Sequence, residues 1–293
     1  MADEIEDPRA VLRRHGLRPK RSWGQNFLVN RALVARMADE IARDGIEQVV
    51  EIGAGVGTLT AALAARVGRV VAVERDPDLV RLLRAESPSW GGRVEVVDAD
   101  ATSFDYVAAA AGGVTAIAGN LPYQITGRLL RRVVEARGVI RRAVVMVQSE
   151  VADRLGAAPG GKEYGVLGVM CQAWFEVTRL WRVAPGSFHP RPAVSSAVVG
   201  LVPLERPRVG DLGEDALARL VHAAFASRRK TMRNALSASF PLDDVLAALE
   251  AEGLEPSRRA ETLAVEQLAA LARRLCQSSQ GTGTKRAPSR TTR

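Results

Sequence analysis

The stretch GNLPYQITGR, residues 119–128, sets an amide, a proline and an aromatic ring side by side at the end of an apolar run. The Asn120 side chain and the Leu121 carbonyl can each accept a hydrogen bond, because Pro122 keeps the residue before it extended and its carbonyl outward. Two such acceptors favour a more tetrahedral nitrogen on a base amine, and the Tyr123 ring offers a surface on which an extruded base stacks. The stretch predicts alkylation of a base amine, unless it is only a turn that fills a sheet edge.

A glycine-rich turn, EIGAGVG at 51–57, closes one Val/Ile-rich run and opens an amphipathic stretch. Gly53 and Gly55 let the backbone turn tightly and approach a ligand closely, although such turns also serve plain packing. Glu74 ends the next Val-rich run, 21 residues after Gly53. A carboxylate at this place can accept ribose hydroxyls, which suits NAD and S-adenosylmethionine equally.

A third acidic position separates these two nucleotides. The segment DADA at 98–101 places Asp100 where a carboxylate could accept the amine of an adenine ring lying across the strand ends, with Asp98 as the alternative. Together with Asn120, this spacing favours S-adenosylmethionine. Catalysis would rest on positioning and electrostatics, because the sulfonium charge disperses in the transition state. No histidine base is needed, since the methylated ammonium can lose its proton to water.

These residues need a sheet to position them, and short Val/Ile-rich runs alternating with amphipathic stretches predict βαβ units. The expected strands are 47–53, 69–74, 93–100, 114–120 and 141–148, and the expected helices are 58–66, 77–85 and 126–137. Two extended runs, 164–183 and 195–204, joined by a Pro-rich segment, predict an antiparallel edge. The fold class is therefore α/β, a Rossmann-like and mostly parallel methyltransferase sheet with an antiparallel edge.

The composition changes after "ERPRVGDLGED", and the chain from about 211 to 275 reads as short helices. We expect a cofactor-binding domain over 1–206, a small helical RNA-binding domain over 207–276 and a disordered basic tail over 277–293. In the helical part, the cluster SRRKTMRN would present Arg228, Arg229, Lys230 and Arg233 to a phosphate track if it lies on a helix. A solvated helix face is the alternative.

The charge of the 293-residue chain favours a polyanionic partner, since the formal net charge is +8. Residues 8–36 hold eight Lys or Arg and no acid, and Lys20 and Arg21 within this basic arm are candidate RNA contacts. A solvated arm is the alternative. The two cysteines lack the paired spacing of a metal site and indicate ordinary thiols in a reducing compartment. No apolar run is long enough to span a membrane, so we expect a cytoplasmic protein.

Taken together, the motifs resemble those of the KsgA-type ribosomal RNA adenine dimethyltransferases of the small subunit. The resemblance covers roughly residues 18–275 and is carried by RSWGQNFLVN, EIGAGVGTLT, VERD, DADA, GNLPYQIT, VQSEVADRL, APGGKEYGVLGVM, PGSFHPRPAVSSAVV and SRRKTMRNAL. It implies a seven-stranded sheet with a small helical C-terminal domain. It also implies S-adenosylmethionine as cofactor, no metal, and dimethylation of two adjacent adenines in the 3′-terminal hairpin loop of 16S ribosomal RNA. The implied partner is the immature small subunit, bound by a monomer.

The resemblance also assigns roles to residues. It implies cofactor contacts from a set of residues comprising Asn26, Leu28, Gly53, Gly55, Glu74, Asp100 and Asn120. It implies a catalytic motif at Asn120, Leu121, Pro122 and Tyr123, with Phe188 completing the pocket for the target base. The sequence departs from the family at Ala193 and Ser195, where lysine and aspartate usually stand. These two departures put the local substrate contacts beside Phe188 in question.

Three other functions are weighed against this one. A large-subunit RNA methyltransferase of the macrolide-resistance type shares the sheet and a motif close to Asn-Leu-Pro-Tyr. A ribosome-assembly factor could keep the fold and bind RNA without turnover, although the intact motif argues against it. An NAD-dependent oxidoreductase is disfavoured, because no acid for hydride transfer stands near the strand ends and Asp100 would have no role.

Overall fold

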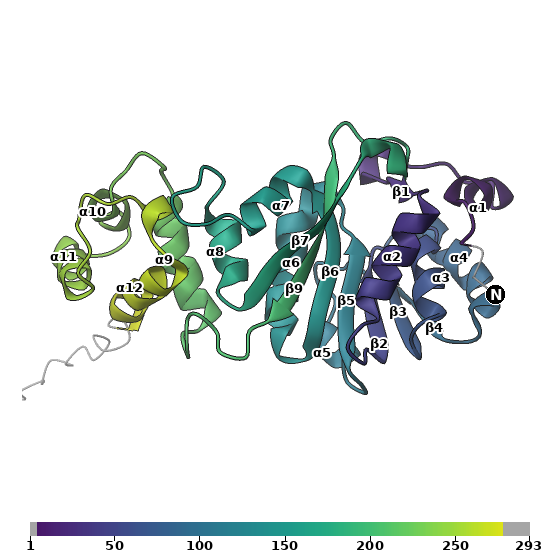
Figure 1. Cartoon of the computed structure of the whole chain (residues 1–293), viewed down its shortest axis with the longest axis horizontal. Helices are drawn as coiled ribbons and strands as arrows, with labels where there is room; N and C mark the ends of the chain where they lie inside the picture. The colour runs from purple at the N-terminus through teal and green to yellow at the C-terminus, as the bar shows by residue number, and fades with distance from the viewer. Residues whose placement is uncertain (1–4, 278–293) are drawn as a thin grey trace, which may run out of the picture. The chain divides into compact units, whose positions relative to one another are not determined.

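The computed structural model describes residues 5–277, which belong to two compact units (Figure 1). The first unit comprises the chain up to Gly156 together with Trp174–Glu205. The second comprises Ala157–Ala173 together with the chain from Arg206. This division differs from the expected continuous domain over 1–206, because residues 157–173 fold with the helical unit. Of the expected tail, residues 278–293 lie outside the described part of the chain.

The first unit is built on a seven-stranded sheet with the order β4-β3-β2-β5-β6-β9-β7. Its strands are β2 (Gln48–Ile52), β3 (Arg69–Glu74), β4 (Val94–Asp98), β5 (Thr115–Asn120), β6 (Ile140–Gln148), β7 (Phe175–Val183) and β9 (Ser196–Pro203). Strands β2 to β6 pair in parallel, and β9 pairs antiparallel with both β6 and β7. The predicted fold class is confirmed, including the antiparallel edge.

The strand order reverses between β2 and β5. From β2 the chain runs outward to β3 and β4, and it then returns to pair β5 with the other side of β2. In open α/β sheets, ligands bind outside the carboxyl ends of the strands at such a switch point. The topology therefore specifies one crevice, beyond Ile52 and Asn120, as the place for a ligand.

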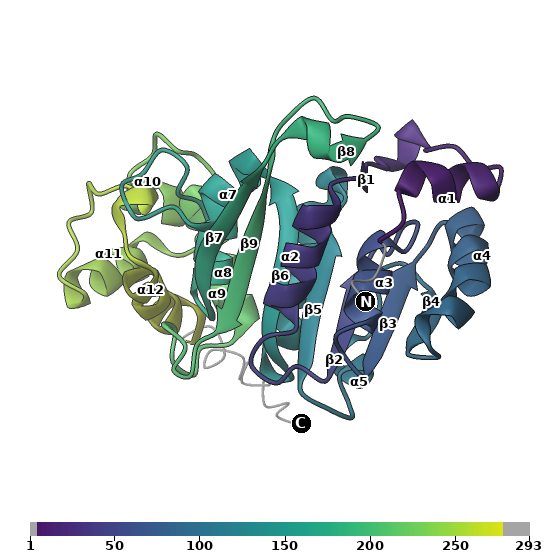
Figure 2. The ribbon, with the colours of Figure 1, turned by 45° about the vertical axis from the view of Figure 1, so that its right-hand side comes forward.

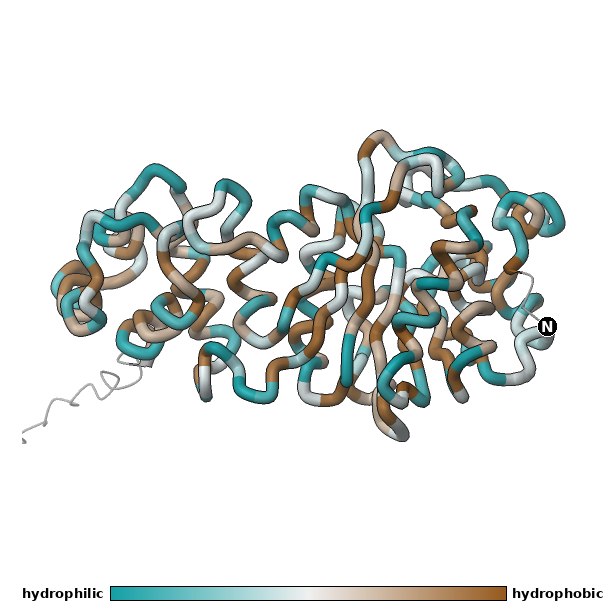
Figure 3. The backbone as a smooth tube through the Cα atoms, in the orientation of Figure 1, coloured by the Kyte–Doolittle hydropathy of each residue, from teal (hydrophilic) through white to brown (hydrophobic). Residues whose placement is uncertain are grey.

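Burial on both faces explains why the central strands form. Val49, Val50, Val70, Ile117 and Ala118 are all fully buried, as expected for parallel strands with helices on both sides. Figure 3 shows these strands as mostly hydrophobic and the connecting loops as mostly hydrophilic.

The helices of the first unit are α2 (Arg31–Ile41), α3 (Thr58–Ala64), α4 (Pro77–Glu86), α5 (Tyr106–Ala109), α6 (Thr126–Glu135) and α7 (Ser149–Leu155). Helix α2 lies on the face of the sheet turned toward the viewer in Figure 2, against β5 and β6. Helix α4 starts where Asp76 caps the Asp78 N–H and Pro77 takes the first helical position, which needs no backbone N–H.

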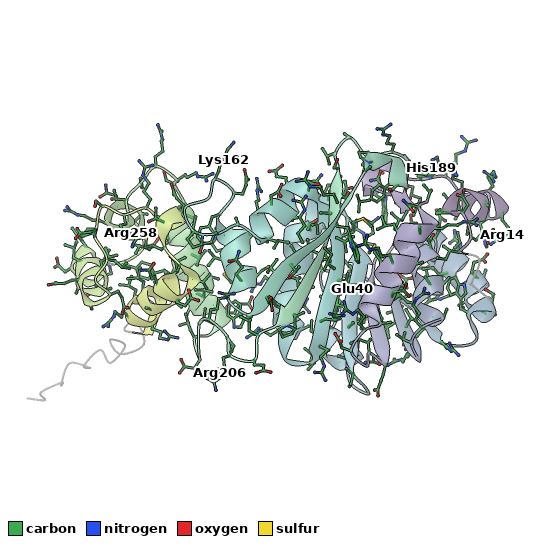
Figure 4. All side chains as sticks on the ribbon, viewed as in Figure 1. Arg14, Glu40, Lys162, His189, Arg206 and Arg258 are labelled. Atoms are coloured by element: carbon green, nitrogen blue, oxygen red, sulfur yellow. The ribbon has the colours of Figure 1, made fainter. Side chains whose placement is uncertain are left out.

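The basic N-terminal block is folded rather than a solvated arm. It contains α1 (Pro8–Arg14), a 3₁₀ turn (Arg21–Trp23), β1 (Phe27–Leu28) and α2. Strand β1 pairs antiparallel with β8 (Phe188–His189), and α2 buries Val34, Met37, Ala38 and Ile41. Arg14, labelled in Figure 4, forms ion pairs with Glu6 and Glu86. Acids elsewhere in the unit thus neutralise part of this charge.

The second unit is helical. Its helices are α8 (Val166–Gln172), α9 (Glu214–Phe225), α10 (Met232–Leu236), α11 (Leu242–Ala251) and α12 (Val265–Gln277). The expected extended run from 164 is therefore wrong over 166–172, which forms α8 and packs on α9. The Tyr164 hydroxyl donates to the Leu263 carbonyl at 3.0 Å, which fixes the start of this segment within the helical unit.

The basic cluster does not lie on a helix as expected. Helix α9 ends at Phe225, and Arg228, Arg229 and Lys230 occupy a turn before α10. Thr231 caps α10 through its side chain, and the Met232 N–H donates to the Arg258 carbonyl at 2.7 Å. The cap and this contact between loops stop α9 from continuing.

Both cysteines are free thiols, as predicted, and burial raises the pKa of Cys171 to about 12. Within residues 5–277, no helix is long and apolar enough to cross a membrane. The same residues contain no group of three or more His, Cys, Asp or Glu side chains arranged for a metal ion.

Candidate active site

A cavity of the first unit lies at the carboxyl ends of β2, β3 and β5, at the switch point of the sheet. It brings together ten of the predicted site residues: Asn26, Leu28, Gly53, Gly55, Glu74, Asp100, Asn120, Leu121, Pro122 and Tyr123. Residues that are far apart in the sequence thus line the same cavity. Further lining comes from Trp23, Glu51, Thr58, Arg75 and Met146.

The glycine turn forms one side of this cavity. Gly53 and Gly55 adopt φ angles of 68° and 62°. Residues with a Cβ atom rarely adopt this left-handed backbone conformation. A Cβ on Gly55 would also stand 3.2 Å from the Phe27 ring. The turn therefore needs glycine at residue 55 both for its conformation and for the close approach of β1.

Glu74 stands at the end of β3 with its carboxylate held by the backbone. The N–H groups of Gly55, Arg75 and Asp76 each donate to it at 2.9 Å. Burial raises the pKa of Glu74, and the three backbone hydrogen bonds oppose that shift. A carboxylate fixed in this way fits the predicted contact with ribose hydroxyls.

Asp100 lines the cavity, whereas Asp98 is exposed and lies outside its lining. The Thr102 N–H and hydroxyl both donate to Asp100 Oδ1, at 2.8 and 2.7 Å. Arg75 reaches Oδ2 at 3.2 Å and stacks over Trp23, with 4.8 Å between the guanidinium carbon and the ring centre. These hydrogen bonds lower the pKa of Asp100, so its carboxylate is ionised and suits an amine donor.

The orientation of the Asn120 amide is set by a neighbour. Its Nδ2 donates to the Asn26 carbonyl at 2.9 Å, and because a carbonyl only accepts, the amide cannot be turned round. The other amide atom, Oδ1, is thereby left as an acceptor at the cavity. Among the described residues, none donates to Oδ1 of Asn120 or to the Leu121 carbonyl.

Tyr123 follows at the start of a 3₁₀ turn, Tyr123–Ile125. Its ring lines the cavity, and its hydroxyl is 2.8 Å from Ser196 Oγ. Burial raises the pKa of Tyr123, which keeps the phenol neutral. A neutral ring at the wall of the cavity can stack on a base.

The sequence analysis missed Glu51, which lies within β2 and lines the cavity. Its side chain is 2% exposed, and the Thr60 hydroxyl donates to it at 2.6 Å. Burial raises the pKa of Glu51 to about 8. A lone carboxylate inside a buried strand, directly after two valines, is the signal that could have found it.

Two polar groups of the cavity call for a ligand. Glu51 faces no cation within the described residues. The Thr58 hydroxyl is buried without a hydrogen-bond partner in the same part of the chain. Buried polar groups are normally paired, so a ligand with a positive charge and hydrogen-bonding groups fits this space. S-adenosylmethionine has both.

The segment that follows α1 closes one side of the cavity. Lys20 forms ion pairs of 2.6 and 2.7 Å with Asp76 and Asp78, and Gln25 donates to Asp76 at 2.7 Å. The Lys20 ammonium is thus engaged within the chain, which weakens its assignment as an RNA contact. The side chain of Arg21 lies outside the described part of the structure.

Phe188 does not reach the cavity lining. It is 4% exposed and sits opposite Leu28 in the β1–β8 pair, within the apolar core. The structure therefore does not place Phe188 in the base pocket as predicted. Its side chain is packed in the apolar core beside β1 instead. The neighbouring Ala193 and Ser195 are exposed.

In the second unit, the predicted basic cluster forms an exposed surface with loops that the prediction did not include. Arg228, Arg229, Lys230 and Arg233 are exposed. The Arg228 guanidinium donates to the Lys162 carbonyl, and Met232 binds the Arg258 carbonyl. Lys162, labelled in Figure 4, is exposed, whereas Arg258 is half-buried and its guanidinium donates to the Thr262 hydroxyl and carbonyl at 3.2 and 2.7 Å.

Comparison with known proteins identifies relatives over nearly the whole chain. The family model for ribosomal RNA adenine dimethylases matches residues 16–277. A ribosomal RNA small subunit methyltransferase A from Myxococcus xanthus is 42% identical over 96% of this chain and 99% of its own. One from Geobacter metallireducens is 44% identical over 89% and 97%, respectively.

Two solved structures are similar in fold. A dimethyladenosine transferase from Plasmodium falciparum superposes with a TM-score of 0.73 at 23% identity, over 84% of this chain and 95% of its own, which shows a shared fold. The 23S ribosomal RNA methyltransferase ErmE gives a TM-score of 0.62 at 28% identity, over 86% and 100%.

Proposed function

The chain belongs to the ribosomal RNA adenine dimethylase family, and from that membership we propose that it dimethylates two adjacent adenines in the 3′-terminal hairpin loop of 16S ribosomal RNA. It is an S-adenosylmethionine-dependent adenine dimethyltransferase that modifies small-subunit ribosomal RNA. The choice of the two adenines, the immature small subunit as substrate, a monomeric enzyme and a cytoplasmic location are parts of the proposal.

The observation that carries the catalytic part is the fixed amide of Asn120. When bound, S-adenosylmethionine supplies a methyl group on a positively charged sulfur. The chain's task is then to hold the target amine with its electron pair in line with that methyl. Oδ1 of Asn120 accepts one N–H of the amine, and the Leu121 carbonyl accepts the other. The Tyr123 ring supports the base from one face.

Glu51, Glu74 and Asp100 supply the binding side of the same cavity. Glu74 takes the ribose hydroxyls and Asp100 takes the adenine amine of the cofactor. Glu51, buried and without a cation of its own, suits the positively charged end. The ionised Asp100 favours S-adenosylmethionine over a dinucleotide with its anionic pyrophosphate, and a cation beside Glu51 would favour loss of the proton that burial retains there.

RNA binding is assigned to the exposed basic surface of the second unit. Three of its loops meet there, and they carry the exposed Lys162, the cluster at Arg228, Arg229 and Lys230, and Arg259, which follows the half-buried Arg258. Cations on loops can follow a phosphate backbone without reading base sequence. This surface supports binding of a large RNA, while the cavity selects the amine.

The test is methyl transfer to small subunits isolated from cells that lack the protein. Labelled S-adenosylmethionine and the wild-type protein should place four methyl groups on two adjacent adenines near the 3′ end, as read by mass spectrometry of RNA fragments. Asn120→Ala should leave most of these adenines unmodified over the time in which the wild-type protein completes the reaction. Label on large-subunit RNA instead would favour the macrolide-resistance type, and binding of small subunits without label would favour an assembly factor.

A further inference from the structure

The ring of Tyr123 is held by a residue that lies 73 positions further along the chain. Its hydroxyl is 2.8 Å from Oγ of Ser196, the first residue of β9, which is completely buried. In the sheet order, β6 separates β9 from β5, the strand that leads to Tyr123. The Tyr123 side chain therefore reaches from the segment after β5, past β6, to the first residue of β9.

Ser196 is a rigid anchor. It pairs with Gln148 of β6 on one side and with Val183 of β7 on the other. The Ser149 hydroxyl also donates to the Ser196 carbonyl at 3.1 Å. These contacts fix the backbone of Ser196, and its completely buried side chain has little room to change rotamer, whereas Tyr123 belongs to a short 3₁₀ turn.

A tyrosine side chain has two torsions between its backbone and its ring. With the backbone set by the turn after Pro122 and the hydroxyl set by Ser196, both ends of the Tyr123 ring are fixed. A ring fixed at both ends presents a defined face to the cavity. A ring without the hydroxyl contact could rotate, and a base stacked on it would lose its alignment with the acceptors at Asn120 and Leu121.

We propose that Ser196 is a positioning residue for base methylation, acting through its hydrogen bond to Tyr123. This inference rests on the proposed function. Ser196 is the second of two adjacent serines in the sequence PRPAVSSAVV. The first, Ser195, is exposed. The pair supplies a matched control, since Ser195→Ala removes the same atom one residue away from the contact.

The first measurement is spectroscopic and independent of RNA. The chain has three tyrosines, so labelling with 3-fluorotyrosine gives three fluorine resonances, and Tyr123→Phe identifies the one of interest. Ser196→Ala should shift and broaden this resonance and leave those of Tyr106 and Tyr164 in place. Ser196→Thr, which keeps a hydroxyl, and Ser195→Ala should reproduce the wild-type spectrum.

The second measurement is the single-turnover rate of methyl transfer to small-subunit RNA. Loss of one neutral hydrogen bond predicts a rate about five- to tenfold lower for Ser196→Ala, with S-adenosylmethionine affinity within about twofold of wild type. In a Tyr123→Phe background, Ser196→Ala should have no further effect, because both changes break the same contact. Ser196→Thr should restore the rate.

An unchanged Tyr123 resonance in Ser196→Ala would overturn the proposal, and so would an unchanged rate or an equal loss of rate in the Tyr123→Phe background. If the wild-type protein itself fails to methylate the RNA, the proposed function fails instead. The fluorine spectra then still decide whether Ser196 fixes the ring.

Discussion

Glu51 makes the stability of this protein depend on pH in a way that one substitution can expose. Its carboxyl is 2% exposed and accepts a hydrogen bond from Thr60. Burial, with a smaller contribution from the negative charge of Glu74, raises its pKa from 4.5 to about 8, against the opposing effect of the Thr60 bond. The folded protein therefore holds this proton more tightly than the unfolded chain does.

The sign and size follow from proton linkage. Since the folded pKa of Glu51 lies above the unfolded value, the contribution of this group to stability is greatest below about pH 4.5, falls between pH 4.5 and 8, and levels off above. One pKa unit corresponds to about 1.4 kcal/mol. Between pH 6 and pH 9, about two units of this shift are expressed, so the free energy of unfolding should fall by about 2–3 kcal/mol.

Glu51→Gln removes the titration and keeps the shape of the side chain. Urea unfolding of wild type and variant at pH 6, 7.5 and 9 gives the difference in stability, in which the titrations of all other groups largely cancel. The variant should gain about 2–3 kcal/mol relative to wild type across this range. Glu176→Gln, at an exposed position of β7, is the control. A difference between Glu51→Gln and wild type that does not change with pH would refute the reasoning.

The other predictions concern the catalytic motif, the cofactor and the RNA. Asn120→Ala should lower the single-turnover methylation rate about a hundred- to thousandfold while RNA affinity is kept, and a rate near wild type would remove Asn120 from catalysis. Glu74→Ala should weaken S-adenosylmethionine binding about tenfold or more in calorimetry; equal affinity would contradict the ribose contact. Replacing the basic cluster, Arg228, Arg229, Lys230 and Arg233, by alanine should lower the salt slope of RNA binding by about one unit per lost phosphate contact, whereas an unchanged slope with unchanged affinity would make it a solvated surface.

Most of the parallel part of the sheet could be predicted because strands β2, β3, β5 and β6 are largely buried on both faces, whereas β4 is half-exposed. Val/Ile-rich runs placed strands β2 to β6 within two residues of their observed ends, as in Arg69–Glu74, whereas the short β1 was not predicted. The same rule fails for Val166–Gln172, an equally apolar run that forms a helix. Its conformation is decided by packing on α9, which begins 42 residues further on at Glu214, and a short apolar run does not contain that information.

The basic residues show the same limit for charge. Eight cations without an acid within 8–36 suggest a solvated arm or an RNA contact. Some of the acids that pair with them are close in sequence, as Glu6 is to Arg14, but others are distant: Glu86 also pairs with Arg14, and Asp76 pairs with Lys20. In the second unit, the turn at Arg228 depends on the loop that carries Arg258. Charge patterns identify candidate surfaces, but the fold decides which cations stay available.

Most of the predicted site residues that face the cavity could be found from the sequence. Their residue types, as at Gly55, Glu74 and Asn120, follow directly from the chemistry of binding a ligand. Two residues of common types were not recognised: Glu51, which lines the cavity, and Ser196, which sets the geometry of Tyr123. Asn120 shows why both kinds are needed. An asparagine can accept from an amine, but so can an aspartate, and the difference lies in Nδ2, which must donate to the Asn26 carbonyl. A carboxylate in its place would set two acceptors 2.9 Å apart and lose the contact that aims the oxygen, so the requirement for asparagine comes from the segment before β1 as much as from the reaction.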